Sequence, residues 1–495
     1  MAETPAPRAT SNRSTTPGSS TFKDFIGSQW ADRARSTPAA REQAAFAAER
    51  RARISALHPG VTLVVPAGQA KVRSNDCDYP FRAHSAFAHL TGWGTDAVVG
   101  SVLVLAPSAG GSGHDATLYF RASAGRDSEE FYANPEIGEF WVGPRPSLDE
   151  VAADLGIATA DLGEFAVVAD ALGSDALLVR DADPTFTESI DTRVGALVGG
   201  VAEQDGVPAT DDALARDLSE IRLVKDAYEI NEIRRAVAAT GHGFADVIAD
   251  FDQVLAHPRG ERIVEGTFNR RARADGNTVG YDTIAASGSH ACILHWTRND
   301  GAVQPGDLIL IDAGVEVDSL YTADITRTLP VSGTFDDIQR LVYDAVLEAA
   351  DAAFAIVKPG ITFREVHATA MQVIARKTAE WGFLPVSAEE SLQPDAQYHR
   401  RYMVHGTSHH LGLDVHDCAK ARRELYIDGV VEAGMVFTIE PGLYFQADDL
   451  TVPEEFRGIG VRIEDDILVT EDGAENLSVG IPRTASDVEA WIARS

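Results

Sequence analysis

Two aspartates in one stretch, residues 308–330, have the type and spacing for metal chemistry. The stretch opens with four aliphatic residues typical of a buried strand, which delivers Asp312 at its end, and it returns through a turn to Asp324. If the two halves pair as neighbouring strands, the two carboxylates converge on one point. A carboxylate at the end of a buried strand is costly to desolvate unless it meets a cation or hydrogen-bond donors. For the pair taken alone, ordinary turn residues are the alternative explanation.

Three downstream segments carry further ligand-type residues on strand-like or turn-like backbone. They are residues 402–417, which contain His405, His409, His410 and His416, residues 435–444, which end an apolar run at Glu440, and residues 458–469, which place Glu464 in a predicted strand beside Arg462. Taken singly, each segment has an ordinary structural explanation. Taken together, four carboxylates in or at the ends of buried strands repel one another unless cations lie between them. Two divalent ions would balance the four carboxylates, so the sequence predicts a dinuclear site.

The order and contexts of these residues resemble those of the pita-bread metallopeptidases and, among them, the Xaa-Pro aminopeptidases (aminopeptidase P). The residues and contexts are Asp312 in DAG, Asp324 in ADITRT, His409 in HGTSHHLGLDVHD, Glu440 in TIEPGLY and Glu464 in RIEDD. The resemblance covers residues 40 to 485 and includes a signature of that family's N-terminal domain at residues 76–93. It implies an α+β pita-bread catalytic domain, with two related halves facing each other around the metals, after a smaller α/β domain of the creatinase type.

The resemblance also implies a role for each residue of the metal shell. Asp324 and Glu464 are expected to bridge both ions, Asp312 to complete the shell of one ion, and His409 with Glu440 to complete that of the other. The implied nucleophile is a hydroxide that bridges the metals, with its pKa lowered by their charge. An oxygen-rich shell with one imidazole suits a hard divalent cation, so Mn2+ is expected in preference to Zn2+.

Other residues are expected by resemblance to act on the substrate or to support the ligands. His416 would stabilise the tetrahedral oxyanion, His295 would contact the substrate near the scissile bond, and His405 would line the pocket for the prolyl ring. The residues expected to hold donors and ligands in place are Tyr281, Tyr444 and Arg462. Trp141 resembles a tryptophan that leans toward a neighbouring subunit's cleft, so a homodimer or homotetramer is expected. The sequence departs from the family pattern at His290, where many relatives carry an Asn-containing turn, and at Trp296, where Tyr is frequent.

The function that follows is a metal-dependent aminopeptidase, which releases the N-terminal residue from peptides with proline in the second position. One alternative is a prolidase that cleaves Xaa-Pro dipeptides with the same ligands. The context separates the two weakly, since Ser408 stands where prolidases often carry Gly. The other alternative is a peptide-binding relative without catalysis, but all five ligands are present here.

Composition restricts the partners and the compartment. The net charge is −32 over 495 residues, which argues against nucleic acid or an anionic membrane as a partner. The three scattered cysteines are typical of reduced thiols in a cytoplasmic protein. No apolar run approaches the roughly 18 residues of a spanning helix, and the first residues lack the apolar core of a signal peptide.

The chain is expected to divide into three parts: a flexible tail at residues 1–38, an N-terminal α/β domain at 39–205 and the catalytic domain at 220–485. The elements predicted for the α/β domain are helices at 39–57 and 148–155 and strands at 61–65, 97–105, 117–120 and 165–169. Those predicted for the catalytic domain are a long helix capped by Asp226, helices at 335–357 and 363–381, and strands at 436–439, 460–463 and 467–469.

Overall fold

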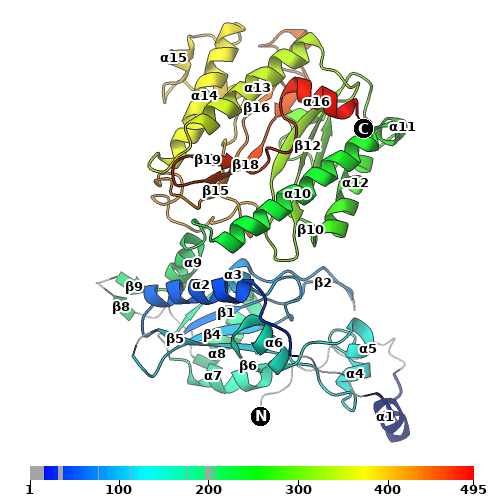
Figure 1. The fold of residues 1–495 in the computed structure, drawn as a ribbon, viewed down its shortest axis with the longest axis vertical. Coiled ribbons are helices and arrows are strands. Elements are labelled where there is room, and N and C mark those ends of the chain that lie inside the picture. Colours follow the sequence, from blue (N-terminus) through cyan, green and yellow to red (C-terminus); the bar gives the residue numbers. More distant parts are fainter. Residues whose placement is uncertain are drawn as a thin grey trace. The chain divides into compact units, whose positions relative to one another are not determined.

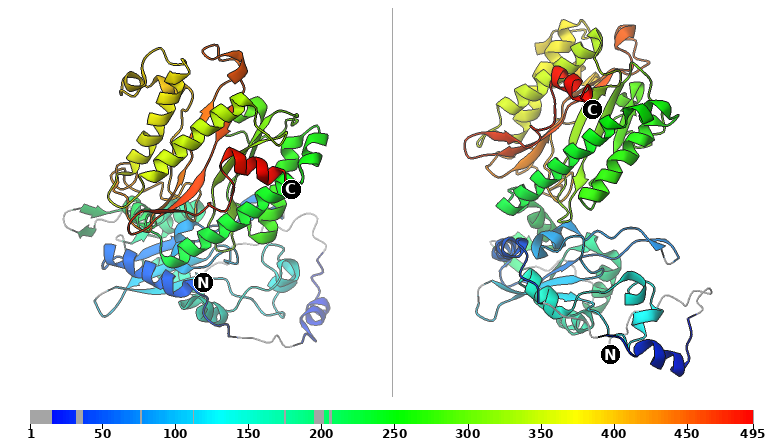
Figure 2. Two further views of the ribbon diagram at one scale, coloured as in Figure 1. Left: turned by 45° about the horizontal axis from the view of Figure 1, so that its top comes forward. Right: turned by 45° about the vertical axis from the view of Figure 1, so that its right-hand side comes forward.

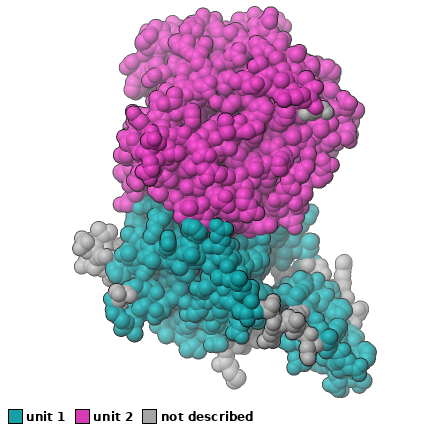
Figure 3. Space-filling view, viewed as in Figure 1, with its two compact units in different colours: residues 1–221 teal, residues 222–495 magenta. Residues whose placement is uncertain are grey.

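The computed structural model (Figure 1) describes most of the chain, in seven segments: residues 16–31, 37–75, 77–111, 113–173, 176–194, 202–204 and 207–494. Figure 2 gives two further views of the ribbon. The described residues belong to two compact units, unit 1 within residues 1–221 and unit 2 within residues 222–495, which Figure 3 colours separately. No helix in the described segments is long and apolar enough to cross a membrane.

Unit 1 is built on a five-stranded sheet of order β6-β5-β4-β1-β7. Its strands are β1 (Leu63–Pro66), β4 (Val102–Pro107), β5 (His114–Phe120), β6 (Ala158–Asp161) and β7 (Leu177–Leu178). Its principal helices are α2 (Gln43–Leu57), α3 (Ser85–Thr91), α6 (Leu148–Leu155), α7 (Phe165–Ala171), α8 (Pro184–Val194) and α9 (Asp211–Glu220). Alternate residues of β1 face opposite sides of the sheet. Leu63 and Val65 pack in one core with Phe87, whereas Val64 packs in another with Phe165, so helices cover both faces.

The structure corrects one predicted element of unit 1. Residues 165–169, predicted as a strand, form the first part of helix α7. Phe165 and Ala169 are both buried, while Val167 between them is 74% exposed. This is the spacing of one helix face, and packing of that face against the sheet decides the conformation.

Part of the segment predicted as a flexible tail is helical. Residues 1–15 and 32–36 lie outside the described residues, but Ser20–Gly27 form helix α1. The Ser19 hydroxyl caps this helix by accepting a hydrogen bond from the backbone N–H of Phe22. The Phe22 ring then packs edge-on against Tyr132, with 5.5 Å between ring centroids. Aromatic contact with the rest of unit 1 therefore orders a segment whose own composition is polar.

Unit 2 combines two pairs of long helices with small antiparallel sheets. The helices are α10 (Ala227–Ala249), α12 (Gly260–Asp275), α13 (Asp337–Ala355) and α14 (Phe363–Glu380). The strands that position the site are β11 (Ile284–Ser287), β12 (Leu308–Ala313), β14 (Ile325–Pro330), β15 (Val436–Ile439), β16 (Gly442–Tyr444), β17 (Gly460–Arg462), β18 (Asp465–Val469) and β19 (Ala474–Asn476). They form the sheets β11-β12-β14, β15-β18-β19 and β16-β17. Helix α10 packs on α12, and α13 packs on α14, as Figure 1 shows.

Two local predictions for unit 2 are confirmed. The side chains of Asp226 and Glu229 form a reciprocal capping box at the start of α10, and Thr362 with Glu365 forms another at the start of α14. Strands β12 and β14 pair antiparallel with Asp312 opposite Thr326. This register brings Asp312 close to Asp324, the residue that precedes β14.

Candidate metal centre and active site

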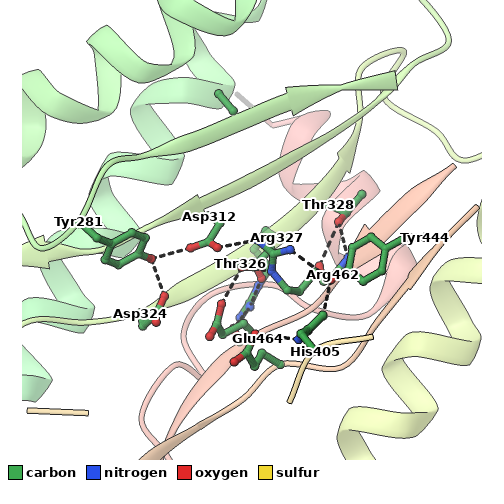
Figure 4. Close-up of polar contacts among 12 residues, drawn as sticks. Tyr281, Asp312, Asp324, Thr326, Arg327, Thr328, His405, Tyr444, Arg462 and Glu464 are labelled. Carbon is green, nitrogen blue, oxygen red and sulfur yellow. Dashed lines mark hydrogen bonds and ion pairs between the residues drawn. The ribbon is translucent and has the colours of Figure 1, made fainter. Parts of the chain in front are cut away.

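Tyr281 joins the two aspartates of residues 308–330. Its hydroxyl oxygen lies 2.6 Å from Asp312 Oδ1 and 2.5 Å from Asp324 Oδ1, so it can donate its single proton to either carboxylate (Figure 4). Burial, followed by the negative charges of Asp312 and Asp324, raises the pKa of Tyr281 well above its ordinary value. The phenol therefore stays protonated and holds the two carboxylates side by side.

Arg462 connects these aspartates, which lie in the first half of unit 2 (residues 222–330), to its second half (residues 331–494). From β17, its Nη2 donates to Asp312 Oδ2 at 2.5 Å and its Nη1 donates to the Tyr444 hydroxyl at 3.1 Å. Its Nε donates to Thr326 Oγ1 at 3.1 Å, and that hydroxyl donates in turn to Glu464 Oε2 at 2.7 Å (Figure 4). The guanidinium is buried, so these contacts are shielded from solvent. One cation thereby orients ligand-type residues from both halves.

The geometry brings three candidate metal ligands within reach of one ion. Atoms of Asp324, His409 and Glu464 that can bind a metal all lie within 4.8 Å of one another. His409 Nε2 lies 3.2 Å from Asp324 Oδ2 and 3.7 Å from Glu440 Oε1. These residues and the nearby Asp312 present carboxylate oxygens and one imidazole, a donor set that fits hard divalent cations.

The electrostatics of the cluster indicate a site for positive charge. Burial raises the pKa of Glu440 to about 7, and burial together with the charges of Asp324 and Glu440 raises that of Glu464 well above its ordinary value. The pKa of His409 rises to about 9 even though burial lowers it, because Asp324 accepts its hydrogen bond and adds a negative charge. Carboxylates that attract protons in this way will also attract metal cations.

The structure places the predicted substrate-contacting histidines beside this cluster. The His416 ring lies 4.5 Å from the His409 ring, centroid to centroid, and nearly perpendicular to it. His405 Nε2 lies 2.8 Å from the Tyr444 hydroxyl, and its Nδ1 lies 3.6 Å from Glu440 Oε2. Burial, then the charge of Arg462, lowers the pKa of His405 to about 3, and burial, then the charge of His409, lowers the pKa of His416. Both imidazoles are therefore neutral at physiological pH.

Two further predicted site residues are His295 and Trp141. His295 is exposed, on the loop that follows the short helix η3 (Gly288–Cys292). Its imidazole is among the groups that lower the pKa of His416. Trp141 belongs to unit 1, where it is 55% exposed on helix α5 (Glu139–Val142) and its Nε1 donates to the Tyr132 carbonyl at 2.8 Å. Trp141 is thus the one predicted site residue outside unit 2.

Sequence reasoning missed three residues, Thr326, Thr328 and Asp466, that lie two or four positions after a predicted ligand. Thr326 contacts Glu464, and Thr328 exchanges hydrogen bonds with the backbone of Arg462. Asp466 Oδ2 accepts a hydrogen bond from the backbone N–H of Asp324 at 3.2 Å. Each lies two or four residues from a predicted ligand, the spacing that puts side chains on one face of a strand. The two-residue repeat of a strand could therefore have identified these residues from the sequence.

Glu464, expected inside a run of β structure, lies between the two strands predicted at 460–463 and 467–469. Strand β17 ends at Arg462 and β18 begins at Asp465. The Glu464 N–H donates to the Thr326 carbonyl at 3.1 Å, and the Glu464 carbonyl accepts from Arg327 Nη1 at 2.6 Å. The backbone of Glu464 therefore bonds to β14 from the other half, which brings its carboxylate to the aspartates.

Comparisons with known proteins agree with this geometry. Residues 231–471 match the model of metallopeptidase family M24, and residues 46–176 match that of the aminopeptidase P N-terminal domain. The chain is 52% identical to Xaa-Pro aminopeptidase 2 of Streptomyces coelicolor over 94% of both chains. It is 34% identical to the Xaa-Pro aminopeptidase of Escherichia coli, over 90% of this chain and 96% of that one. The solved structure of Pseudomonas aeruginosa aminopeptidase PepP is 30% identical, with a TM-score of 0.77, and the match covers 92% of this chain and 99% of that one.

The fold and site define a pita-bread metallopeptidase with an aminopeptidase P N-terminal domain. The chain belongs to metallopeptidase family M24. It is a metallo-aminopeptidase, a hydrolase that uses divalent metal ions and acts on peptides. The predicted fold class and the predicted enzyme class are confirmed, and the prolidase alternative is not favoured.

Proposed function

We propose that this enzyme removes the N-terminal residue from peptides that carry proline in the second position. The observation that carries the proposal is the pair formed by His405 and Tyr444 beside Glu440, with 5.5 Å between the two ring centroids. A prolyl nitrogen in a peptide bond has no N–H to donate, so a proline-specific pocket must accept the ring instead. Two neighbouring rings with flat apolar faces suit that task. The relatives named Xaa-Pro aminopeptidase support the same substrate class.

The proposed metal site holds two divalent ions. Asp324 and Glu464 would bind both, Asp312 would complete one shell, and His409 with Glu440 would complete the other. Mn2+ is the proposed ion, because a shell of four carboxylates and one imidazole suits a hard cation. When bound, the ions supply Lewis-acid activation of water and of the peptide carbonyl. A zinc-substituted aminopeptidase P from Escherichia coli has been solved with product, so Mn2+ and Zn2+ should be compared directly.

The remaining residues would orient and stabilise the reacting groups. Neutral His416 would donate an N–H to the oxyanion that develops on the scissile carbonyl. His295 would contact the substrate next to that bond. Tyr281 and Arg462 would hold the aspartate ligands through the hydrogen bonds described above.

The experiment that tests this proposal is Asp324→Asn, with Asp282→Asn as the matched control. Asp324 is buried within the cluster, whereas Asp282 is exposed one residue after Tyr281. Asp324→Asn should lower metal content and abolish hydrolysis of Ala-Pro-Ala, because an amide replaces a carboxylate that would serve both ions. Asp282→Asn should retain both properties. A fully active Asp324→Asn enzyme would overturn the proposed site.

The proposal extends to the whole chain. The α/β domain would span residues 39–205 and the catalytic domain residues 220–485, a division supported by the two compact units.

The enzyme would be a homodimer or homotetramer in which Trp141 reaches a partner's site. The exposed side chains of Phe140, Trp141 and Val142 support a contact there. A cytoplasmic location is supported by Cys77, Cys292 and Cys418, which are all free thiols. Analytical ultracentrifugation of the wild type and of Trp141→Ala would test the assembly.

A further inference from the structure

A buried carboxylate outside the metal cluster, that of Glu261 on helix α12, accepts as many hydrogen bonds as its oxygens can. Its side chain is 0% exposed. Oε1 accepts from the Ser287 backbone N–H at 2.9 Å and from His290 Nδ1 at 2.7 Å. Oε2 accepts from the Gly301 backbone N–H at 2.6 Å and from Trp296 Nε1 at 2.9 Å. The two oxygens therefore accept four hydrogen bonds, which is the capacity of a carboxylate.

All four donors belong to one loop, residues 287–301. The loop starts at the end of β11 and returns to α12, where the Gly301 carbonyl accepts from the Glu261 backbone N–H at 3.2 Å. A Cβ atom at position 301 would lie 2.7 Å from Glu261 Oε2 and 2.8 Å from His290 Cε1. Glycine thus permits the close approach of the loop to the carboxylate. Glu261 closes this loop at both ends and in its middle.

The two side-chain donors stack on each other. The rings of His290 and Trp296 lie 3.9 Å apart at 26°. Trp296 also packs against the apolar cluster that contains Ile284, Leu310 and Tyr444. Because each ring places an N–H on the same carboxylate, Glu261 fixes the orientation of both rings relative to Tyr444. These are the two positions at which the loop departs from the family pattern.

His295 lies within this loop, directly before Trp296. It is exposed, and in the described part of the chain no hydrogen bond holds its imidazole. Its backbone carbonyl accepts from the Thr297 N–H at 3.0 Å, a contact inside the loop. The position of the imidazole therefore depends on the backbone of the loop, and the backbone depends on the Glu261 contacts.

We propose that Glu261 is a positioning residue of the peptidase, which locks the His290–Trp296 stack and thereby holds His295 toward the substrate. The inference rests on the substrate role proposed above for His295. Displacing a substrate-contacting group by about 1 Å can cost 100-fold in rate. A buried carboxylate with four satisfied hydrogen bonds also stabilises the fold, so the test must separate positioning from stability.

The test is a double-mutant cycle between Glu261→Gln and His295→Ala, with Glu265→Gln as control. Glutamine keeps the shape of Glu261, but its amide NH2 faces two donors in place of an oxygen. Glu265 lies one turn further along α12 and is partly exposed. Glu261→Gln should lower kcat for Ala-Pro-Ala by about 10- to 100-fold with metal content unchanged. In the His295→Ala background the same substitution should change kcat by less than about twofold. Glu265→Gln should leave kcat unchanged in both backgrounds.

The other outcomes overturn the inference in distinguishable ways. If Glu261→Gln lowers kcat equally in both backgrounds, or in neither, Glu261 does not act through His295. If His295→Ala alone leaves kcat unchanged, the role proposed for His295 fails first and the inference falls with it. Trp296→Phe provides a second cycle, which keeps an aromatic ring but removes the Nε1 donor together with part of the indole ring system. It should lower kcat about threefold to tenfold, and this effect too should disappear in the His295→Ala background.

Discussion

Arg462 Nη2 lies 2.5 Å from Asp312 Oδ2, and both side chains are buried. Asp312 is the penultimate residue of strand β12, and Arg462 is the last residue of β17 in the other half of unit 2. The pair therefore links the two halves directly beside the proposed metal ligands. The other oxygen of Asp312 is held by Tyr281, so the orientation of this carboxylate is fixed from two sides.

The buried network of Arg462 should be intolerant of lysine. A lysine ammonium cannot reach Asp312, Thr326 and Tyr444 together, because it lacks the planar fork of the guanidinium. Arg462→Lys should lower the free energy of unfolding by about 3 kcal/mol, measured by urea denaturation. Arg234→Lys is the control, since Arg234 forms an exposed pair with Glu475 in which both side chains are 46% exposed. An Arg462→Lys enzyme as stable as the control would show that the network contributes little.

Tyr281 should affect metal affinity more than stability. Tyr281→Phe removes the hydroxyl that holds Asp312 and Asp324, and leaves the ring in place. The expected result is a 10- to 100-fold higher apparent Kd for Mn2+, which is roughly the loss of affinity when a group that orients a metal ligand is removed. Chelator-buffered titration measures it, with Tyr398→Phe, at an exposed tyrosine, as control. Unchanged affinity would mean that the aspartates are oriented without Tyr281.

His416 should act on the substrate and not on the metals. His416→Ala should keep its metal content and lose kcat by about 100- to 1,000-fold, the cost of one oxyanion donor. Metal analysis and steady-state kinetics on the same preparation separate the two effects. His242→Ala, at a histidine whose side chain is 67% exposed, serves as control. Loss of metal from His416→Ala would identify His416 as a ligand.

Acid should destabilise the fold through Asp417. Its carboxylate lies 3.0 Å from Arg222 Nε and 3.3 Å from Lys225 Nζ. Burial alone would raise the pKa of Asp417, but the two cations outweigh burial. The pKa therefore falls from the ordinary 3.8 to about 2. Because the folded pKa is the lower one, the stabilisation is complete above about pH 4 and is lost as pH falls toward 2. Asp417→Asn should lower the free energy of unfolding at pH 7 and flatten its decline between pH 4 and 2. An equally steep decline in the variant would assign the acid sensitivity to other groups.

The sequence was most informative where a charge interrupts a buried strand. Asp312 follows an aliphatic run and Glu440 follows a largely apolar one, and desolvation of such a charge requires a partner whatever the surrounding fold. The pairing of β12 with β14 also followed from local pattern, because the chain runs through an apolar strand, turns near Asp318 and returns to Asp324 within a few residues of β14. Helix caps such as Asp226 with Glu229 depend on residues three positions apart, so they too could be predicted.

The features that the sequence did not predict depend on contacts distant along the chain. Residues 165–169 form a short apolar run that suits a strand or a helix, and packing of Phe165 and Ala169 decides between them. The backbone of Glu464 is held by the Thr326 carbonyl and the Arg327 guanidinium in the other half. The four contacts of Glu261 join residues that are 26 to 40 positions away in the chain. No local pattern marks such contacts.

The most direct test of this account is the metal dependence of peptide cleavage by the wild-type enzyme. The metal-free protein should be inactive, and reconstitution with about two Mn2+ per chain should restore release of alanine from Ala-Pro-Ala. The reconstituted enzyme should have a higher kcat/KM for Ala-Pro-Ala than for Ala-Pro or Ala-Ala-Ala. Cleavage without metal would contradict the metal centre. A kcat/KM for Ala-Pro higher than that for Ala-Pro-Ala would identify the enzyme as a prolidase. A kcat/KM for Ala-Ala-Ala higher than that for Ala-Pro-Ala would contradict the proposed specificity for proline.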